Sequence, residues 1–180
     1  KYILQLDDDI DISYKSLNKM LAYISKYSNI AISPVLVDKK TNISPFDKIP
    51  ENFFFKIYHF ILNGKKGFLP GSISKAGVPY GYNLLKKNVS EVEWLPGGCI
   101  LHKNTNLVKK NYFKFNIKKA YCEDLFHSFY LKKKNIKLLV DPKIRCEYEN
   151  FKGFSSLNYK EALVLLLEDL KIRFFFIYCQ

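Results

Sequence analysis

The stretch Tyr2 to Leu6 (YILQL) leads directly into Asp7, Asp8 and Asp9. A short apolar run that is entered without a turn signal and followed by a helical pattern is typical of a buried strand. We therefore expect Tyr2 to Leu6 to be a central strand of a parallel sheet. Ligands of open α/β sheets bind beyond the carboxyl ends of such strands, which is where the three acids lie.

Three adjacent carboxylates repel one another unless a cation or strong hydrogen-bond donors lie nearby. Their oxygen atoms suit Mg²⁺ or Mn²⁺, which proteins commonly share with a substrate phosphate. The alternative is an acidic turn before a helix, because Asp11 or Ser13 suits as the N-cap of the helical pattern that includes Leu17. On this stretch alone both interpretations stay open.

Composition limits the classes of protein that this chain can belong to. With 180 residues, of which 48% are hydrophobic, the chain is long enough for one domain and too apolar for a disordered protein. The net charge of +12 comes from scattered lysine pairs, so we expect non-specific surface charge and no specific nucleic-acid partner. The four cysteines show no C-x-x-C pair, which argues against a zinc module and favours reduced thiols in the cytoplasm.

The order of apolar segments predicts alternating strands and helices. We expect a helix from Ser13 to Tyr27, a strand from Ile30 to Val37 in which Pro34 marks an edge or a bulge, and a strand from Val92 to Leu101. A helix from Tyr121 to Lys134 and a last buried strand from Ile136 to Val140, closed by Asp141 and Pro142, follow. The pattern predicts an α/β fold with a mostly parallel sheet flanked by helices.

The C-terminal apolar stretch from Ala162 to Cys179 contains four charged residues, Glu168, Asp169, Lys171 and Arg173, which exclude an ordinary membrane span. We expect residues 155–180 to form an amphipathic helix that packs on the domain or on a membrane surface.

The region from Asn63 to Gly98 holds every glycine of the chain except Gly153. A long segment of this composition is usually a binding loop or disordered. Its aromatic residues, which are Phe68, Tyr80, Tyr82 and Trp94, favour binding, although the same rings suit a core equally well. At Gly97 and Gly98 the backbone can approach a ligand closely, because no side chain intervenes.

Glu123 and Asp124 begin the helix expected near residue 121. Acids in the first turn of a helix are common and mildly stabilising, by about 0.3–1 kcal/mol. The same position keeps a carboxylate ionised, and an ionised carboxylate can take a proton from an attacking hydroxyl group. The pair is therefore either a helix-capping feature or a general base.

Three segments in this order resemble the landmarks of family 2 glycosyltransferases of GT-A fold. They are LQLDDDIDI, VEWLPGGCILHK and AYCEDLFHSFYLKKKNIKLLVDP, which match the DxD strand, the W-x-x-G-G segment and the E-D helix with its following strand. The resemblance implies a partial GT-A, Rossmann-like domain over residues 1–154. It implies that Asp7 and Asp9 bind a divalent metal, Mg²⁺ or Mn²⁺, and that Asp7, Asp8, Asp9, Gly97 and Gly98 lie at a nucleotide-diphosphate sugar.

The resemblance also implies that Asp124, with Glu123 beside it, is the catalytic base of an inverting transfer to an acceptor hydroxyl. The acceptor would be a glycan or a lipid-linked molecule in surface polysaccharide or glycoconjugate synthesis. We expect this chain to be cytoplasmic, and peripheral contact with the inner face of the cell membrane stays an open alternative. The family's glycine-rich loop, here Gly64 to Asn83, would shape the acceptor side.

Two departures from the family pattern stand out. The family has nucleotide-binding βαβ units before the DxD strand, whereas this chain begins with that strand, so roughly 90 residues are missing and we expect a fragment. Many members carry a His after the last strand, where this chain has Tyr148 between Glu147 and Glu149.

Two other classes of protein remain in competition. One is a non-catalytic glycan or nucleic-acid binding module derived from a degenerate transferase. The other is a metal-dependent phosphoester hydrolase, because acidic clusters with Mg²⁺ also serve that chemistry.

Overall fold

The computed structural model describes residues 1–47, 52–82, 88–109, 115, 122–149 and 159–179. Within these residues six strands form one mixed sheet in the order β1-β5-β3-β6-β2, with β4 (Ser90–Val92) pairing with β6 off this path. Only β3 and β6 run parallel, and every other pair is antiparallel. The α/β class is correct, but the prediction of a mostly parallel sheet is wrong.

Strand β1 (Tyr2–Leu6) lies at the edge of this sheet and pairs antiparallel with β5 (Cys99–Lys103). Its middle residues are half-buried and its ends, Tyr2 and Leu6, are exposed. The prediction of a central parallel strand is therefore wrong. The reason is that an apolar run indicates burial but carries no information on the direction of the neighbouring strand.

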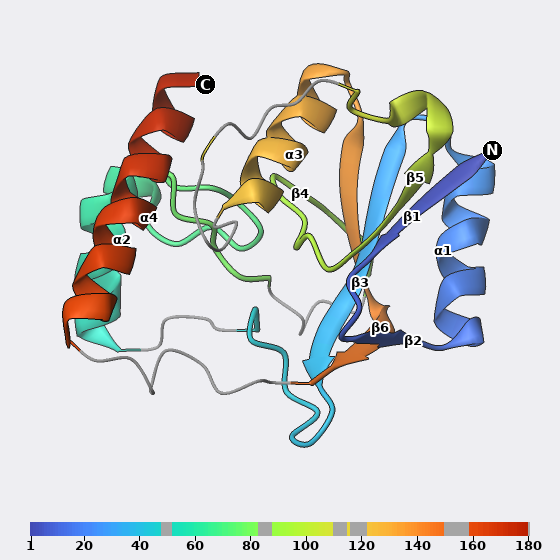
Figure 1. Ribbon diagram of the computed structural model, residues 1–180, viewed down its shortest axis with the longest axis horizontal. Coiled ribbons are helices and arrows are strands. Elements are labelled where there is room, and N and C mark those ends of the chain that lie inside the picture. The colour runs from blue at the N-terminus through green and yellow to red at the C-terminus, as the bar shows by residue number, and fades with distance from the viewer. Residues whose placement is uncertain (48–51, 83–87, 110–114, 116–121, 150–158, 180) are drawn as a thin grey trace.

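The central strand is β3 (Ile30–Asp38), which is buried along its whole length. Its side chains alternate between two core clusters, with Ala31, Val35 and Val37 on one face and Ile30, Ile32 and Leu36 on the other. The sheet is therefore covered on both faces, by helix α1 on one and by α3 on the other, and α4 packs on the outer side of α3 (Figure 1).

The parallel pair of β3 and β6 (Lys137–Tyr148) shifts register after Pro34, so that Pro34 faces Asp141 and Val35 faces Arg145. The predicted bulge at Pro34 is confirmed, and its edge position is wrong. Asp141 and Pro142 lie inside β6 rather than at its end. A bulge tolerates a proline, because the unpaired residues there donate no ladder hydrogen bond.

Helix α1 (Tyr14–Lys26) begins at Ser13, whose side chain accepts a hydrogen bond of 3.1 Å from the Ser16 backbone N–H. The helix buries Met20 and Ile24 against the sheet. A short strand that the sequence did not predict, β2 (Ile10–Ile12), separates this cap from Asp7 to Asp9. The three acids are therefore not the cap of α1.

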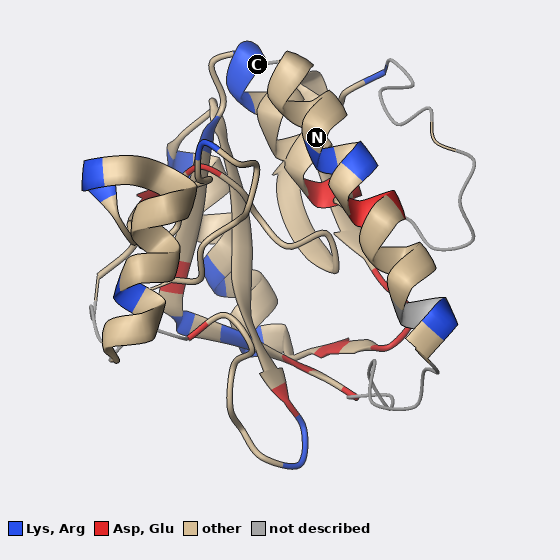
Figure 2. Cartoon of the chain, turned by 90° about the vertical axis from the view of Figure 1, so that its left-hand side faces the viewer, with Lys and Arg blue, Asp and Glu red and all other residues tan. Residues whose placement is uncertain are grey.

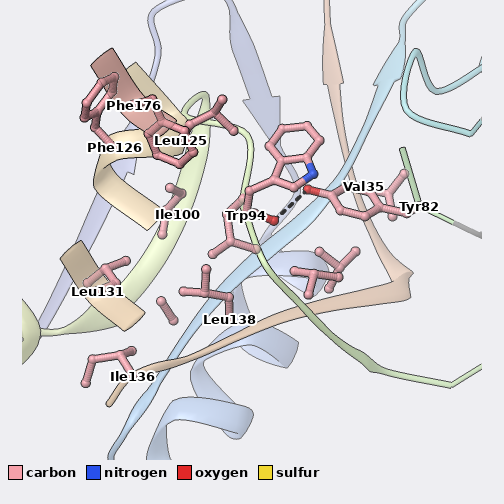
Figure 3. Packing of buried hydrophobic residues seen from close by; sticks show 14 of the residues in the cluster. Val35, Tyr82, Trp94, Ile100, Leu125, Phe126, Leu131, Ile136, Leu138 and Phe176 are labelled. Atoms are coloured by element: carbon pink, nitrogen blue, oxygen red, sulfur yellow. Dashed lines mark hydrogen bonds between the residues drawn. The ribbon is translucent and has the colours of Figure 1, made fainter. Parts of the chain in front are cut away.

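Helix α3 (Glu123–Lys133) and the C-terminal helix α4 (Tyr159–Cys179) share the larger core cluster. Phe176 of α4 packs edge-on against Phe126 of α3, with ring centroids 5.1 Å apart, and Ile172 is also buried (Figure 3). The predicted boundary between residues 154 and 155 lies outside the described residues.

Helix α2 (Phe53–Asn63) and the short 3₁₀ turns η1 (Gly64–Lys66) and η2 (Asn104–Asn106) complete the described elements. Figure 1 shows α2 and α4 at the end of the molecule opposite α1. Among the described helices, none is long and apolar enough to cross a membrane.

The aromatic residues of the glycine-rich region belong to the core. Tyr80, Tyr82 and Trp94 are buried, and the Trp94 indole N–H donates to the Tyr80 carbonyl oxygen at 2.9 Å. Tyr82 stacks on Trp94 with ring centroids 5.4 Å apart (Figure 3). For these three rings the preference for a binding role is therefore wrong, because their area is buried on folding. Phe68 is half-buried, and its role stays a prediction.

Candidate functional site

A cavity of about 270 Å³ lies where β1, the Gly97-Gly98 turn and the start of α3 meet. It brings together five of the residues that the sequence singles out, which are Asp7, Asp9, Gly97, Gly98 and Asp124. The remaining lining residues are Ile10, Leu36, Pro45, Phe46, Pro96 and Tyr148. Residues that are more than 110 positions apart in the sequence therefore share one pocket.

Asp8 and Glu123 do not line this pocket. Asp8 faces a second cavity, which it shares with Asp9, Asp11 and Glu149. Glu123 is exposed at the start of α3. Burial and the nearby Asp7 carboxylate raise the pKa of Glu123, so its side chain lies within electrostatic reach of the pocket.

The acidic end of β1 is attached directly to the glycine pair. The Asp7 backbone N–H donates a hydrogen bond of 2.9 Å to the Gly98 carbonyl oxygen, and this bond continues the pairing of β1 with β5. A Cβ atom at Gly98 would collide with the Ile10 side chain and lie 3.3 Å from Asp7 Oδ2. A side chain at this position would therefore force the Ile10 side chain to move and would press on the Asp7 carboxylate.

Asp124 lies on the other side of the glycine pair. A Cβ atom at Gly97 would be 3.7 Å from the Asp124 Cβ atom, which is ordinary contact. The Asp124 carboxylate is half-buried and accepts a hydrogen bond of 2.9 Å from the Leu125 backbone N–H. Gly98 therefore lies next to Asp7, and Gly97 lies next to Asp124.

Burial raises the pKa of Asp124 to about 6, against the lowering effect of the Leu125 N–H and with a further rise from Glu123. Desolvation therefore outweighs the helix N-terminus, which alone would lower this pKa. A group with a pKa of about 6 is mostly ionised at neutral pH and still basic enough to accept a proton.

The three acids that follow β1 lie close enough to repel one another. The pKa of Asp7 is raised by burial and by the charges of Asp9 and Asp8. A bound cation would relieve this repulsion, and two carboxylates suit Mg²⁺ or Mn²⁺, which take further oxygen ligands from water and phosphate. The role of Asp7 and Asp9 as metal ligands stays a prediction. Within the described part of the chain, no group of three or more His, Cys, Asp or Glu side chains could hold a metal by itself.

Tyr148 occupies the position where the resemblance leads one to expect a histidine, and it lines the pocket. It is held there by the pairing of β2 with β6, in which Ile10 faces Tyr148. Burial, with the charge of Asp38, raises the pKa of the Tyr148 phenol. The ring therefore offers a neutral hydroxyl group rather than an imidazole nitrogen.

The glycine turn is fixed to α3 by a buried hydrogen bond that the sequence did not predict. The Leu95 backbone N–H donates to Ser128 Oγ at 2.9 Å, and both residues are fully buried. Ser128 is one helical turn after Asp124. The contact sets the distance between the Pro96-Gly97-Gly98 turn and the Asp124 carboxylate. No local pattern could have revealed it, because a serine in a helix is usually exposed.

Helix α4 also supports the start of α3. The residue before Glu123 is Cys122, which has a left-handed backbone with a φ of 60°. Its thiol contacts Asp169 Oδ1 of α4 at 3.5 Å, and Asp169 in turn pairs with Arg173 at 2.6 Å. Arg173 also donates to the Gly77 carbonyl oxygen at 2.7 Å. The E-D pair is therefore held in place by a polar network from the C-terminal helix.

His127 does not reach the pocket. It is buried and lies beside the buried His102, with ring centroids 6.2 Å apart. Burial and His102 lower the pKa of His127 to about 4.

Phe46 carries no sequence signal and yet forms a wall of the pocket, where its ring meets Trp94 edge-on with a centroid distance of 5.3 Å.

A larger cavity of about 470 Å³ lies at the other end of α3, near Lys132 and Lys133, and shares no lining residue with the acidic pocket. We assign the chemistry to the smaller cavity, because the carboxylates with raised pKa values lie there.

Comparison with known proteins rests on structure alone. No protein-family model matches the chain, and no curated protein matches its sequence. Among solved structures, the chain is similar to the crystal structure of GalNAc-T7 with UDP, GalNAc and Mn²⁺, with a TM-score of 0.55 at 16% identity. The match covers 84% of this chain and 28% of the other. Over the matched residues, the chain therefore has a glycosyltransferase fold.

Proposed function

We propose that this protein is an inverting glycosyltransferase that moves a sugar from a nucleotide-diphosphate sugar to an acceptor hydroxyl group. The observation that carries the proposal is the one pocket that Asp7, Asp9 and Asp124 line together with Gly97 and Gly98. An acidic pair for a metal diphosphate and a separate carboxylate with a pKa of about 6 supply the two functions that such a reaction needs.

In this reaction the acceptor oxygen forms a bond to the anomeric carbon while the bond from that carbon to the diphosphate oxygen breaks. The bonding electrons leave with the nucleoside diphosphate, and the proton of the acceptor hydroxyl passes to Asp124. Attack from the side opposite the leaving group inverts the anomeric configuration. Glu123, exposed beside Asp124, contributes negative charge that keeps the base basic.

A divalent metal, Mg²⁺ or Mn²⁺, would be held by Asp7 and Asp9 and would stabilise the charge of the leaving diphosphate. Asp8 faces the neighbouring cavity and is proposed to help bind the donor from that side. The glycine pair offers backbone at the pocket wall without side chains, which suits close approach of a sugar.

The similar structure supports the class of ligand proposed here, because GalNAc-T7 was solved with UDP, GalNAc and Mn²⁺. For this chain we propose a nucleotide-sugar donor and a glycan or lipid-linked acceptor in surface polysaccharide or glycoconjugate synthesis. Residues 1–154 would form the catalytic part. A cytoplasmic location is consistent with the four free cysteines.

The test is nucleotide-sugar transfer by the full-length protein and by Asp9→Ala and Asp124→Ala variants. We expect release of nucleoside diphosphate that depends on acceptor and on Mg²⁺ or Mn²⁺, and its loss in both variants while their thermal unfolding stays cooperative. Retained transfer in either variant would overturn the assignment of that residue. Donor consumption without any acceptor would indicate a hydrolase, and glycan binding without turnover would indicate a binding module.

A further inference from the structure

Helix α2 is apolar on the side that faces away from the protein. Of its eleven residues, FFFKIYHFILN, only Asn63 is buried, and His59 and Leu62 are half-buried. At 100° per residue these three lie on one side of the helix, and Phe53, Ile57, Phe60 and Ile61 lie on the other. Phe54 and Ile61 are 80% and 75% exposed. Helices of soluble proteins normally direct such a stripe toward the core.

The helix is nevertheless firmly positioned. Its N-cap, Asn52, accepts a hydrogen bond of 2.9 Å from the Phe55 backbone N–H, and Asn63 Nδ2 donates to the Gly67 carbonyl oxygen at 2.8 Å. The His59 ring packs edge-on against Phe68 and Tyr80, each with a centroid distance of 5.0 Å. The outward apolar face is therefore a property of a capped helix docked through its other side.

Charge favours an anionic occupant for this face. From Phe53 to Lys66 the chain carries three lysines, which are Lys56, Lys65 and Lys66, and no acid. Figure 2 looks at this end of the molecule, where α2 carries blue segments and α4 carries both colours. Two copies of α2 packed against each other would bring these like charges together, whereas an anionic bilayer surface would pair with them.

The length and composition of α2 favour an orientation parallel to the plane of a bilayer. Eleven helical residues extend roughly 16 Å, about half of the hydrocarbon thickness of a membrane, so α2 is too short to span it. Aromatic and aliphatic residues on one face, with lysines beside them, are typical of helices that lie in the headgroup region. Helix α4 lies at the same end of the molecule and also exposes large apolar residues, including Leu166, Leu167 and Phe174 (Figure 1).

We propose that α2 docks the protein onto an anionic membrane surface. Phe53, Phe54, Ile57, Phe60 and Ile61 enter the boundary between headgroups and acyl chains, and Lys56, Lys65 and Lys66 contact anionic headgroups. This proposal does not depend on the function of the acidic pocket, because no residue of α2 or η1 lines that pocket.

The test is co-sedimentation of the full-length protein with vesicles of phosphatidylcholine alone and of an equal mixture of phosphatidylcholine and phosphatidylglycerol. We expect binding to the mixed vesicles and little to phosphatidylcholine alone. A double variant, Phe54→Ser with Ile61→Ser, should lose about tenfold or more of the affinity. Lys65→Glu with Lys66→Glu should lose a similar factor and most of the dependence on phosphatidylglycerol.

Tyr14→Ser is the matched control, because Tyr14 is 80% exposed on α1 at the opposite end of the molecule. It should bind vesicles as the unmodified protein does. All variants replace exposed side chains, so each should unfold at the temperature of the unmodified protein. The proposal is overturned if the unmodified protein ignores anionic vesicles or if the α2 variant binds them equally well. Self-association that the α2 variant abolishes, without vesicle binding, would assign α2 to a protein interface instead.

Discussion

The backbone N–H of Asp7 donates a hydrogen bond of 2.9 Å to the carbonyl oxygen of Gly98. This contact joins the end of the first strand to the turn that faces Asp124, so the positions of both acids depend on one piece of backbone.

Replacing Asp124 by Asn should reduce sugar transfer by about 10²–10⁴-fold, because the amide has the same shape and cannot accept the acceptor's proton. The rate of nucleoside diphosphate release measures this loss. Glu91→Gln is a suitable control, since Glu91 is an exposed residue of β4 that pairs with Lys137 outside the pocket. A similar loss in both variants would argue against a specific role of Asp124.

The pH dependence of transfer follows from the raised pKa of Asp124. A base with a pKa of about 6 is protonated below that pH, so kcat/KM should fall as the pH decreases through about 6 and level off above pH 7. A profile measured between about pH 5 and pH 8 tests this. A kcat/KM that stays constant down to the lowest pH of this range, as for a base with the ordinary aspartate pKa of 3.8, would contradict the raised pKa of Asp124.

The same carboxylate should make the folded protein less stable as the pH rises, whereas it makes the enzyme more active. Between pH 3.8 and about pH 6, Asp124 holds a proton in the folded protein that it has released in the unfolded chain. The free energy of unfolding therefore falls as the pH rises through this window. At neutral pH the cost is at most about 3 kcal/mol. Asp124→Asn should therefore unfold at a higher temperature than the unmodified protein at pH 7, with a smaller difference near pH 4.

Gly98→Ala should impair the site more than Gly97→Ala does. A methyl group at Gly98 collides with Ile10 and presses on the Asp7 carboxylate, whereas one at Gly97 makes only a 3.7 Å contact with Asp124 Cβ. We expect a loss of about 1–3 kcal/mol in unfolding free energy for Gly98→Ala. Metal-dependent transfer should be weakened in the same variant. Equal effects in the two alanine variants, by chemical denaturation and by activity, would contradict this reading.

Ser128→Ala removes the hydrogen-bond acceptor of the buried Leu95 N–H. The unpaired donor should cost about 1–3 kcal/mol of stability, and transfer should decrease because the glycine turn loses its connection to α3. Denaturation and kinetics of this variant can be compared with Ser25→Ala, which alters a serine bonded within α1 at an exposed site. A Ser128→Ala protein as stable as the Ser25→Ala protein would show that the contact is unimportant.

The sequence predicted those parts of the fold that depend on local pattern. Helix α1 with its cap at Ser13 and the bulge at Pro34 follow from side-chain spacing and proline chemistry. The direction and order of the strands were predicted incorrectly. The apolar run of Tyr2 to Leu6 looks the same in an edge antiparallel strand and a central parallel one, because pairing is decided by distant residues such as Cys99 to Lys103.

The sequence likewise predicted only one part of the candidate site. The acids and the glycine pair were visible in the sequence because three acids follow an apolar run and because the segments that hold these residues resemble the landmarks of a known family. The supporting contacts were not, since Ser128, Phe46 and the network of Cys122 with Asp169 connect segments far apart in the chain. The raised pKa of Asp124 was also missed, because burial is a property of the folded structure.

The central claim is that Asp9 and Asp124 act on one substrate in one pocket. A double-mutant cycle in the rate of nucleoside diphosphate release tests it most directly, using Asp9→Asn, Asp124→Asn and the double variant with acceptor and metal present. Residues that serve one reaction show strongly non-additive losses, so the double variant should be about as slow as the slower single variant. Losses that multiply, or a single variant as fast as the unmodified protein, would contradict the claim.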